Sequence, residues 1–121
     1  MTLMEVHIRL ASTAILYTII LALWGLWRFF RRQGVDSAYW GALAIAEILY
    51  VFELGLGLYL WLASGVPTPG MHLLYGVVSI LVIPAVFFYT RGNEERRAVL
   101  LYGVSLLFLM GIAFRAMATA T

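Results

Sequence analysis

Four long hydrophobic stretches alternate with short polar segments along the chain. Each stretch is long enough to cross a hydrocarbon core of about 30 Å as a helix. The polar segments span only a few residues, so consecutive helices are expected to be antiparallel neighbours. The pattern predicts an all-α polytopic membrane protein with an up-down-up-down four-helix bundle. We expect one domain over residues 1–121, with spans at about residues 3–30, 38–63, 69–90 and 94–117.

Residue types that cap helices precede each hydrophobic stretch. A side-chain oxygen just before a helix accepts a hydrogen bond from one of the first free backbone N–H groups. The first of these residues also has a glutamate three positions later, which is the spacing of a capping box. The predicted caps are Thr2, Asp36 or Ser37, Thr68 and Asn93.

The composition narrows the class of protein further. Of the 121 residues, 64% are hydrophobic and 12% charged, and the mean hydropathy is +0.95, which excludes a soluble enzyme. The net charge of +2 comes from eight arginines and no lysine, and this small excess does not favour nucleic-acid binding. The absence of cysteine excludes disulfides and covalent c-type haem attachment. The lipid bilayer is therefore the expected surroundings of the chain.

The arginines predict the orientation. Cytoplasmic loops carry an excess of Lys and Arg, and six arginines flank the first and third connections. Arg9 and Arg115 lie near the opposite ends of their helices. Both termini are therefore expected outside. The preference for arginine over lysine, together with abundant Ala, Leu and Gly, suggests a GC-rich bacterium and so the bacterial cytoplasmic membrane.

Two histidines carry the most specific functional signal. His7 in the first span and His72 in the third are each followed by a small residue four positions on, Ala11 and Gly76. Both histidines lie about 6 to 8 Å from the outer ends of their helices. The first and third helices of a simple bundle stand diagonally opposite, so the two imidazoles would face each other. This geometry suits haem b with two axial histidines, and small neighbours would let the ring edge approach the backbone. The alternative is two interfacial side chains that bond a loop or headgroup.

The pattern resembles the membrane b-type cytochromes, including one half of haem A synthase, where haems lie between histidines of a four-helix bundle. The resemblance covers the architecture and the segments His7-Ile8-Arg9-Leu10-Ala11 and His72-Leu73-Leu74-Tyr75-Gly76. It implies haem b with His7 and His72 as ligands of the haem iron. Arg9 and Arg115 lie near the same surface and are candidates to pair with haem propionates. This chain has one histidine pair where that family has two, which limits it to a single haem.

Two glutamates interrupt the second span. Glu47 lies about 15 Å along this helix, close to mid-membrane, where loss of hydration favours the neutral carboxyl. It is either a proton-carrying group or a carboxyl satisfied by a hydrogen bond. Glu53 lies about 24 Å along the helix, nearer the outer surface. There Arg9 or Arg115 is expected to neutralise it in an ion pair between helices.

Three functions are consistent with the sequence. The first is a small b-type cytochrome or haem-carrying subunit that takes part in electron transfer, with a quinol or a larger respiratory or photosynthetic complex as partner. The second is a cofactor-free accessory subunit of a larger membrane complex. A homo-oligomer is the alternative to such a complex as the assembly that this chain forms. The third is a proton-coupled transporter that uses Glu47. The chain resembles small multidrug-resistance transporters in length and layout, but they use a glutamate in the first helix. These residues favour an electron-transfer or accessory protein over a stand-alone enzyme.

Overall fold

The computed structural model describes residues 2–119 and is all-helical over that part of the chain. Each helix is long and apolar enough to span a membrane. The four helices are α1 (Leu3–Phe30), α2 (Ser37–Leu62), α3 (Gly70–Thr90) and α4 (Arg96–Ala118). They differ by no more than two residues at either end from the spans that the hydrophobic pattern predicts.

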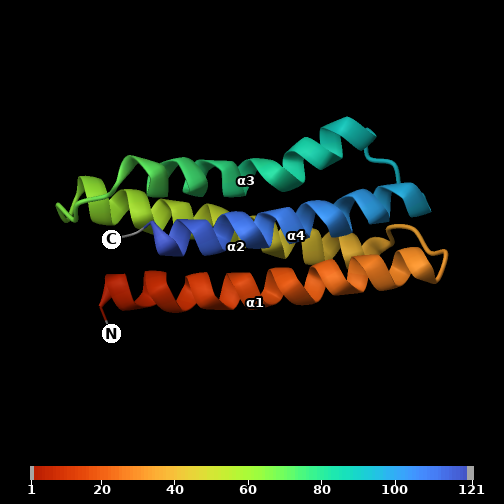
Figure 1. Cartoon of the computed structure of the whole chain (residues 1–121), viewed down its shortest axis with the longest axis horizontal. Helices are drawn as coiled ribbons and strands as arrows, with labels where there is room; N and C mark the ends of the chain where they lie inside the picture. The colour runs from red at the N-terminus through yellow and green to blue at the C-terminus, as the bar shows by residue number, and fades with distance from the viewer. Residues whose placement is uncertain (1, 120–121) are drawn as a thin grey trace.

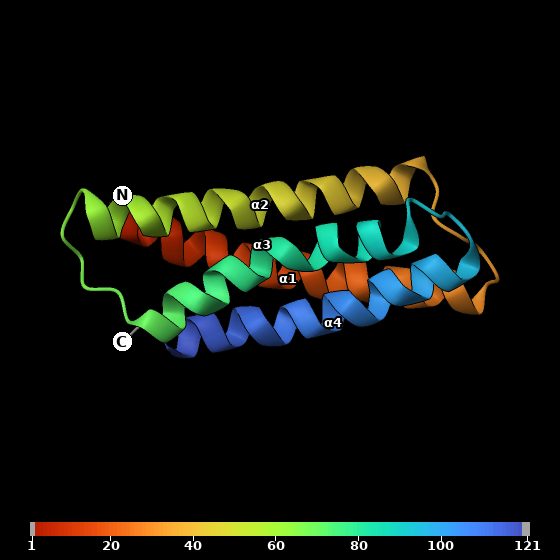
Figure 2. The same cartoon turned by 90° about the horizontal axis from the view of Figure 1, so that it is seen from above.

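The helices run alternately up and down and lie side by side in a bundle (Figure 1). Each helix packs against the helices before and after it in the chain, and α1 also packs closely against α4. Among the described residues, α1 and α3 make no backbone contact, which makes them the diagonal pair, as Figure 2 shows from above. The two parallel helices that carry the histidines therefore face each other across the bundle core.

The two ends of the bundle differ in composition. We call the end formed by connections 31–36 and 91–95 the arginine end, because six of the eight arginines lie in or next to these connections. The other end holds connection 63–69, and the two ends of the described chain also lie there (Figures 1 and 2). We call it the histidine end, because α1 and α3 both begin there and carry His7 and His72 within their first two turns.

Two of the predicted helix caps are confirmed. The Thr2 hydroxyl accepts a hydrogen bond from the backbone N–H of Glu5 at 3.1 Å. The Asp36 carboxylate accepts one from the N–H of Tyr39 at 2.8 Å, which decides between Asp36 and Ser37. Both residues have extended backbone angles, so their side chains reach back over the first turn of the helix.

The other two predicted caps are wrong. Pro69 stands at the N-cap of α3 and makes no side-chain cap bond, while the Thr68 hydroxyl donates to the carbonyl of Val66. Helix α4 starts later than predicted, because Asn93 Oδ1 accepts from the backbone N–H of Glu95 and forms a turn outside the helix. Local hydrogen bonds of this kind compete with capping for the same side chains.

The core is densely filled toward the arginine end. Tyr39 and Tyr102 are almost completely buried there, and Tyr39 donates a hydrogen bond to the carbonyl of Leu21. A Cβ at Gly25 would overlap the Tyr39 hydroxyl and lie 3.4 Å from the Cα of Gly103, so α1 and α4 approach closely at this pair of glycines. The two connections are joined by a hydrogen bond from the N–H of Val35 to the carbonyl of Glu94 at 2.8 Å. The arginine end is therefore closed.

Candidate functional site

A cavity of about 330 Å³ opens inside the bundle at the histidine end. This volume lies within the range of about 300 to 1,000 Å³ that is typical of ligand and cofactor sites. The lining is mainly apolar and comes from all four helices and from Thr68 in connection 63–69. Its polar members are His7, Tyr50, Glu53, Trp61, Thr68, His72 and Ser79.

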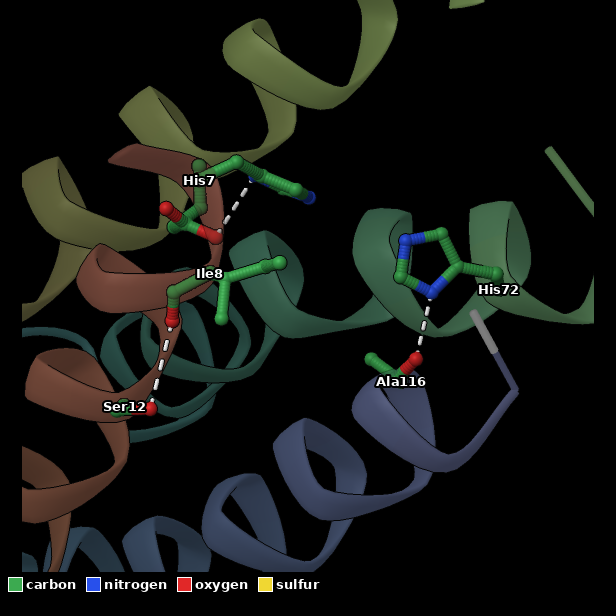
Figure 3. Close-up of polar contacts among 6 residues, drawn as sticks. His7, Ile8, Ser12, His72 and Ala116 are labelled. Atoms are coloured by element: carbon green, nitrogen blue, oxygen red, sulfur yellow. Dashed lines mark hydrogen bonds and ion pairs between the residues drawn. The ribbon is translucent and has the colours of Figure 1, made fainter. Parts of the chain in front are cut away.

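The imidazoles of His7 and His72 extend toward each other across the cavity (Figure 3). Their ring centroids are 6.3 Å apart, and the ring planes are nearly perpendicular, at 88°. The sequence predicts that the two histidines share a depth and face each other, and the structure brings them together. Helix geometry explains this, because α1 and α3 are parallel and each histidine follows the start of its helix by a few residues.

Both Nδ1 atoms lie next to groups that only accept hydrogen bonds. His72 Nδ1 is 2.6 Å from the backbone carbonyl of Ala116 on α4. His7 Nδ1 is 3.0 Å from Glu53 Oε2, at ion-pair distance, although the ring N–H is not well aligned with this oxygen. An acceptor partner places the proton of a neutral histidine on Nδ1. The lone pair of each ring is then on Nε2, and Figure 3 shows the Nε2 atoms on the facing edges of the rings.

Small residues surround the two rings. A Cβ at Gly57 on α2 would lie 3.5 Å from His7 Cε1 and 3.7 Å from His7 Nε2. The cavity is also lined by Ala11 and Gly76, one turn beyond the histidines, and by Ala113 on α4. Side chains that end at Cα or Cβ leave the space beside the imidazoles open to a flat or bulky ligand.

Hydroxyl groups form the deep end of the cavity. The Thr18 hydroxyl donates to the carbonyl of Ala14 at 2.7 Å, and Tyr50 OH lies 2.6 Å from Thr18 Oγ1. Because the Thr18 hydroxyl has one proton and donates it to the Ala14 carbonyl, the Tyr50 hydroxyl is the donor in the second bond. Ser79 donates to the carbonyl of Gly76 at 2.6 Å. These hydroxyls are satisfied within the protein and do not need a ligand.

The cavity offers two imidazole nitrogens, which are too few for a protein-only metal site. Among the described residues no group of three or more His, Cys, Asp or Glu side chains could hold a metal. A tetrapyrrole supplies four ligands of its own and needs only two from the protein. The two imidazoles, with ring centroids 6.3 Å apart, supply two such nitrogen donors from α1 and α3.

Arg9 and Arg115 are exposed and are not among the residues that line the cavity, although each adjoins a lining residue, Ile8 and Ala116. Their pairing with haem propionates stays a prediction. The sequence led us to expect an ion pair between one of these arginines and Glu53, but neither arginine forms one. That position is taken by His7, which lies at the same depth as Glu53 on the neighbouring helix.

Glu47 lies outside the cavity. It is partly buried on α2, and its Oε2 has no hydrogen-bond partner among the described residues. The six-residue separation from Glu53 turns the two side chains about 120° apart on the helix. The two carboxyl groups therefore do not act at one site.

Sequence reasoning missed several residues of the cavity. Gly57, Ala113, Trp61 and Met117 line it from α2 and α4. A signal for Gly57 was present, since it follows Glu53 by one turn on the same face of the helix. The matching depths of Glu53 and His7 were also readable from the helix starts.

No protein-family model, curated protein or solved structure matches this chain.

Proposed function

We propose that this protein is a small b-type cytochrome of a membrane, which binds one haem b between His7 and His72 and takes part in electron transfer. The observation that carries the proposal is the pair of imidazoles that face each other across the cavity, with His72 Nδ1 bonded to the Ala116 carbonyl and His7 Nδ1 at ion-pair distance from Glu53. Haem b, when bound, would supply a one-electron couple. A quinol or a larger respiratory or photosynthetic complex is the proposed redox partner.

The chain's own residues account for the binding step. His7 and His72 would hold the haem iron, and the bond of His72 Nδ1 to the Ala116 carbonyl already restrains that ring before binding. Ala11, Gly57 and Gly76 leave room beside the rings, and the apolar lining excludes water. Exclusion of water limits the reorganisation that accompanies a change of charge in the site.

The test is an absorption spectrum of the detergent-purified protein, oxidised and reduced with dithionite, after expression with sufficient haem. We expect a Soret band and a sharp reduced α-band of a low-spin haem. His7→Ala and His72→Ala should each remove the low-spin spectrum. Met71→Ala is the matched control, since Met71 adjoins His72 but is exposed, and this variant should keep the spectrum.

A colourless, folded wild-type protein would contradict the proposal, as would an unchanged spectrum in both histidine variants. Copurification of the colourless protein with a larger complex would then support the accessory-subunit function. A transporter would instead show substrate-dependent proton release that Glu47→Gln abolishes. Nothing in the cavity favours this last function, because Glu47 does not line it.

We also propose the orientation in the membrane. The excess of arginine at one end supports a bacterial cytoplasmic membrane with the arginine end in the cytoplasm and the histidine end outside. The haem would then lie in the outer half of the bilayer.

The chain has no cysteine, so single cysteines can report the orientation without background. Ser64→Cys lies in connection 63–69, and Gln33→Cys lies in connection 31–36. In intact bacterial spheroplasts, a membrane-impermeant maleimide should label the first variant and not the second. Labelling of Gln33→Cys alone would reverse the proposed orientation.

A further inference from the structure

The two histidines of the cavity have chemically different partners. His72 Nδ1 faces a neutral backbone carbonyl, that of Ala116. His7 Nδ1 faces the carboxyl group of Glu53, whose side chain is only 11% exposed. Of the two partners, only Glu53 can carry a charge.

Glu53 has no other strong contact. Its second oxygen, Oε1, is buried and has no hydrogen-bond partner among the described residues. In the described cavity lining there is no arginine that would offset its charge. A buried carboxylate with a single close partner acts on that partner with little screening, since the effective dielectric inside a protein is far below that of water.

A carboxylate at Nδ1 changes what the opposite nitrogen of the ring can do. It fixes the tautomer, holds the ring in place and increases the electron donation from Nε2 to a bound metal. A neutral carbonyl does the same more weakly. A negative charge close to a redox centre also stabilises the form with the higher positive charge, which for haem is the ferric form.

We propose that Glu53 is a positioning residue that holds His7 and makes it the more strongly donating of the two axial ligands, thereby favouring the oxidised haem. This inference rests on the proposed function. It assigns to Glu53 a task that none of the other cavity residues can perform, because Glu53 is the one carboxylate that the described cavity lining contains.

The experiment is a redox titration of the purified haem protein as wild type, Glu53→Gln and Glu47→Gln. Glutamine keeps the size of the side chain and its acceptor oxygen but removes the charge. Glu47→Gln is the matched control, since it makes the same change on the same helix outside the cavity. We expect Glu53→Gln to keep the low-spin spectrum and to shift the ratio of reduced to oxidised haem at least tenfold toward the reduced form. This is a rise in potential of about 59 mV for a one-electron couple.

Three results would overturn the inference while leaving the proposed function intact. The first is a potential unchanged by Glu53→Gln, and the second is an equal rise in the Glu47→Gln control. The third is loss of haem from Glu53→Gln with retention in the control, which would make the carboxylate a structural requirement. A colourless wild-type protein would instead contradict the proposed function itself. The ferric electron paramagnetic resonance spectrum gives a second measurement, because a change in donation by His7 alters the low-spin signal.

Discussion

The arginine end and the histidine end of the bundle use small residues in opposite ways. At the arginine end, Gly25 and Gly103 let α1 and α4 approach closely, and the buried ring of Tyr39 fills the space beside them. At the histidine end, Gly57 faces a cavity of about 330 Å³. A glycine in a membrane-type helix thus marks either a tight contact or an open space, and the opposite helix decides which.

The difference in packing between the two ends follows from the size of the side chains that point into the bundle at each end. Tyrosine rings from α2 and α4 fill the arginine end, where Tyr39 and Tyr102 are almost completely buried. The lining near the histidine end includes alanine and glycine, and Trp61 and Met117 are partly exposed there. Small side chains therefore contribute to the open space at this end.

The largest effect is expected when a bulky side chain fills the cavity at the histidine end. Gly57→Leu places a side chain against the His7 ring, where even a Cβ would lie 3.5 Å from Cε1. We expect at least a tenfold loss of haem binding, measured as the Soret absorbance per mole of purified protein.

Gly55→Leu is the control for this change. Gly55 lies on the same helix two residues away, and a Cβ there meets no atom within 4 Å. This variant should bind haem like the wild type. Equal binding by both variants would show that the space beside His7 is not used by the ligand.

The second change adds one methyl group to the closed end. In Gly25→Ala the new Cβ overlaps the buried Tyr39 hydroxyl and breaks its hydrogen bond to Leu21. Overpacking of this kind costs about 1 to 3 kcal/mol. Reversible unfolding in mixed detergent micelles should therefore show a loss of stability in this range.

Gly41→Ala tests the same substitution in open surroundings, because a Cβ at Gly41 meets nothing within 4 Å. Alanine is the better helix former, so this variant should be as stable as the wild type or slightly more stable. A loss of stability equal to that of Gly25→Ala would argue against close packing at the arginine end.

The smallest effect is expected at the boundary between the two regions. Tyr50→Phe removes the hydrogen bond from Tyr50 OH to Thr18 Oγ1. We expect a loss of about 1 kcal/mol or less in the free energy of unfolding, since hydrogen bonds between membrane helices contribute modestly. Tyr59→Phe, at an exposed position of the same helix, should leave the stability unchanged. Equal stabilities of the two variants would show that the hydroxyl pair adds nothing.

The four helices could be predicted closely from the sequence. Hydrophobic length is a local property, and so is capping when the side chain faces its own helix, as Thr2 and Asp36 do. Prediction failed at Thr68 and Asn93, where the side chain bonds the backbone of the adjoining loop instead. Nothing in the local sequence decides between these two sets of hydrogen bonds.

The positions of the two histidines along α1 and α3 could be predicted, but the side-chain contacts between helices could not. The shared depth of His7 and His72 follows from counting residues from each helix start. The partner of Glu53 was predicted as an arginine by charge, yet the structure places His7 there. Charge alone does not say which face of a neighbouring helix a residue occupies.

The number, length and alternation of the helices and the face on which each histidine lies follow from the amino-acid sequence alone. Hydrophobic length and helical periodicity contain this information within single segments. Helix packing, in contrast, places Glu53 and Gly57 of α2 beside His7 and the Ala116 carbonyl of α4 beside His72, with the cavity between the two rings. These contacts depend on the rotation and spacing of packed helices, which many side chains set together.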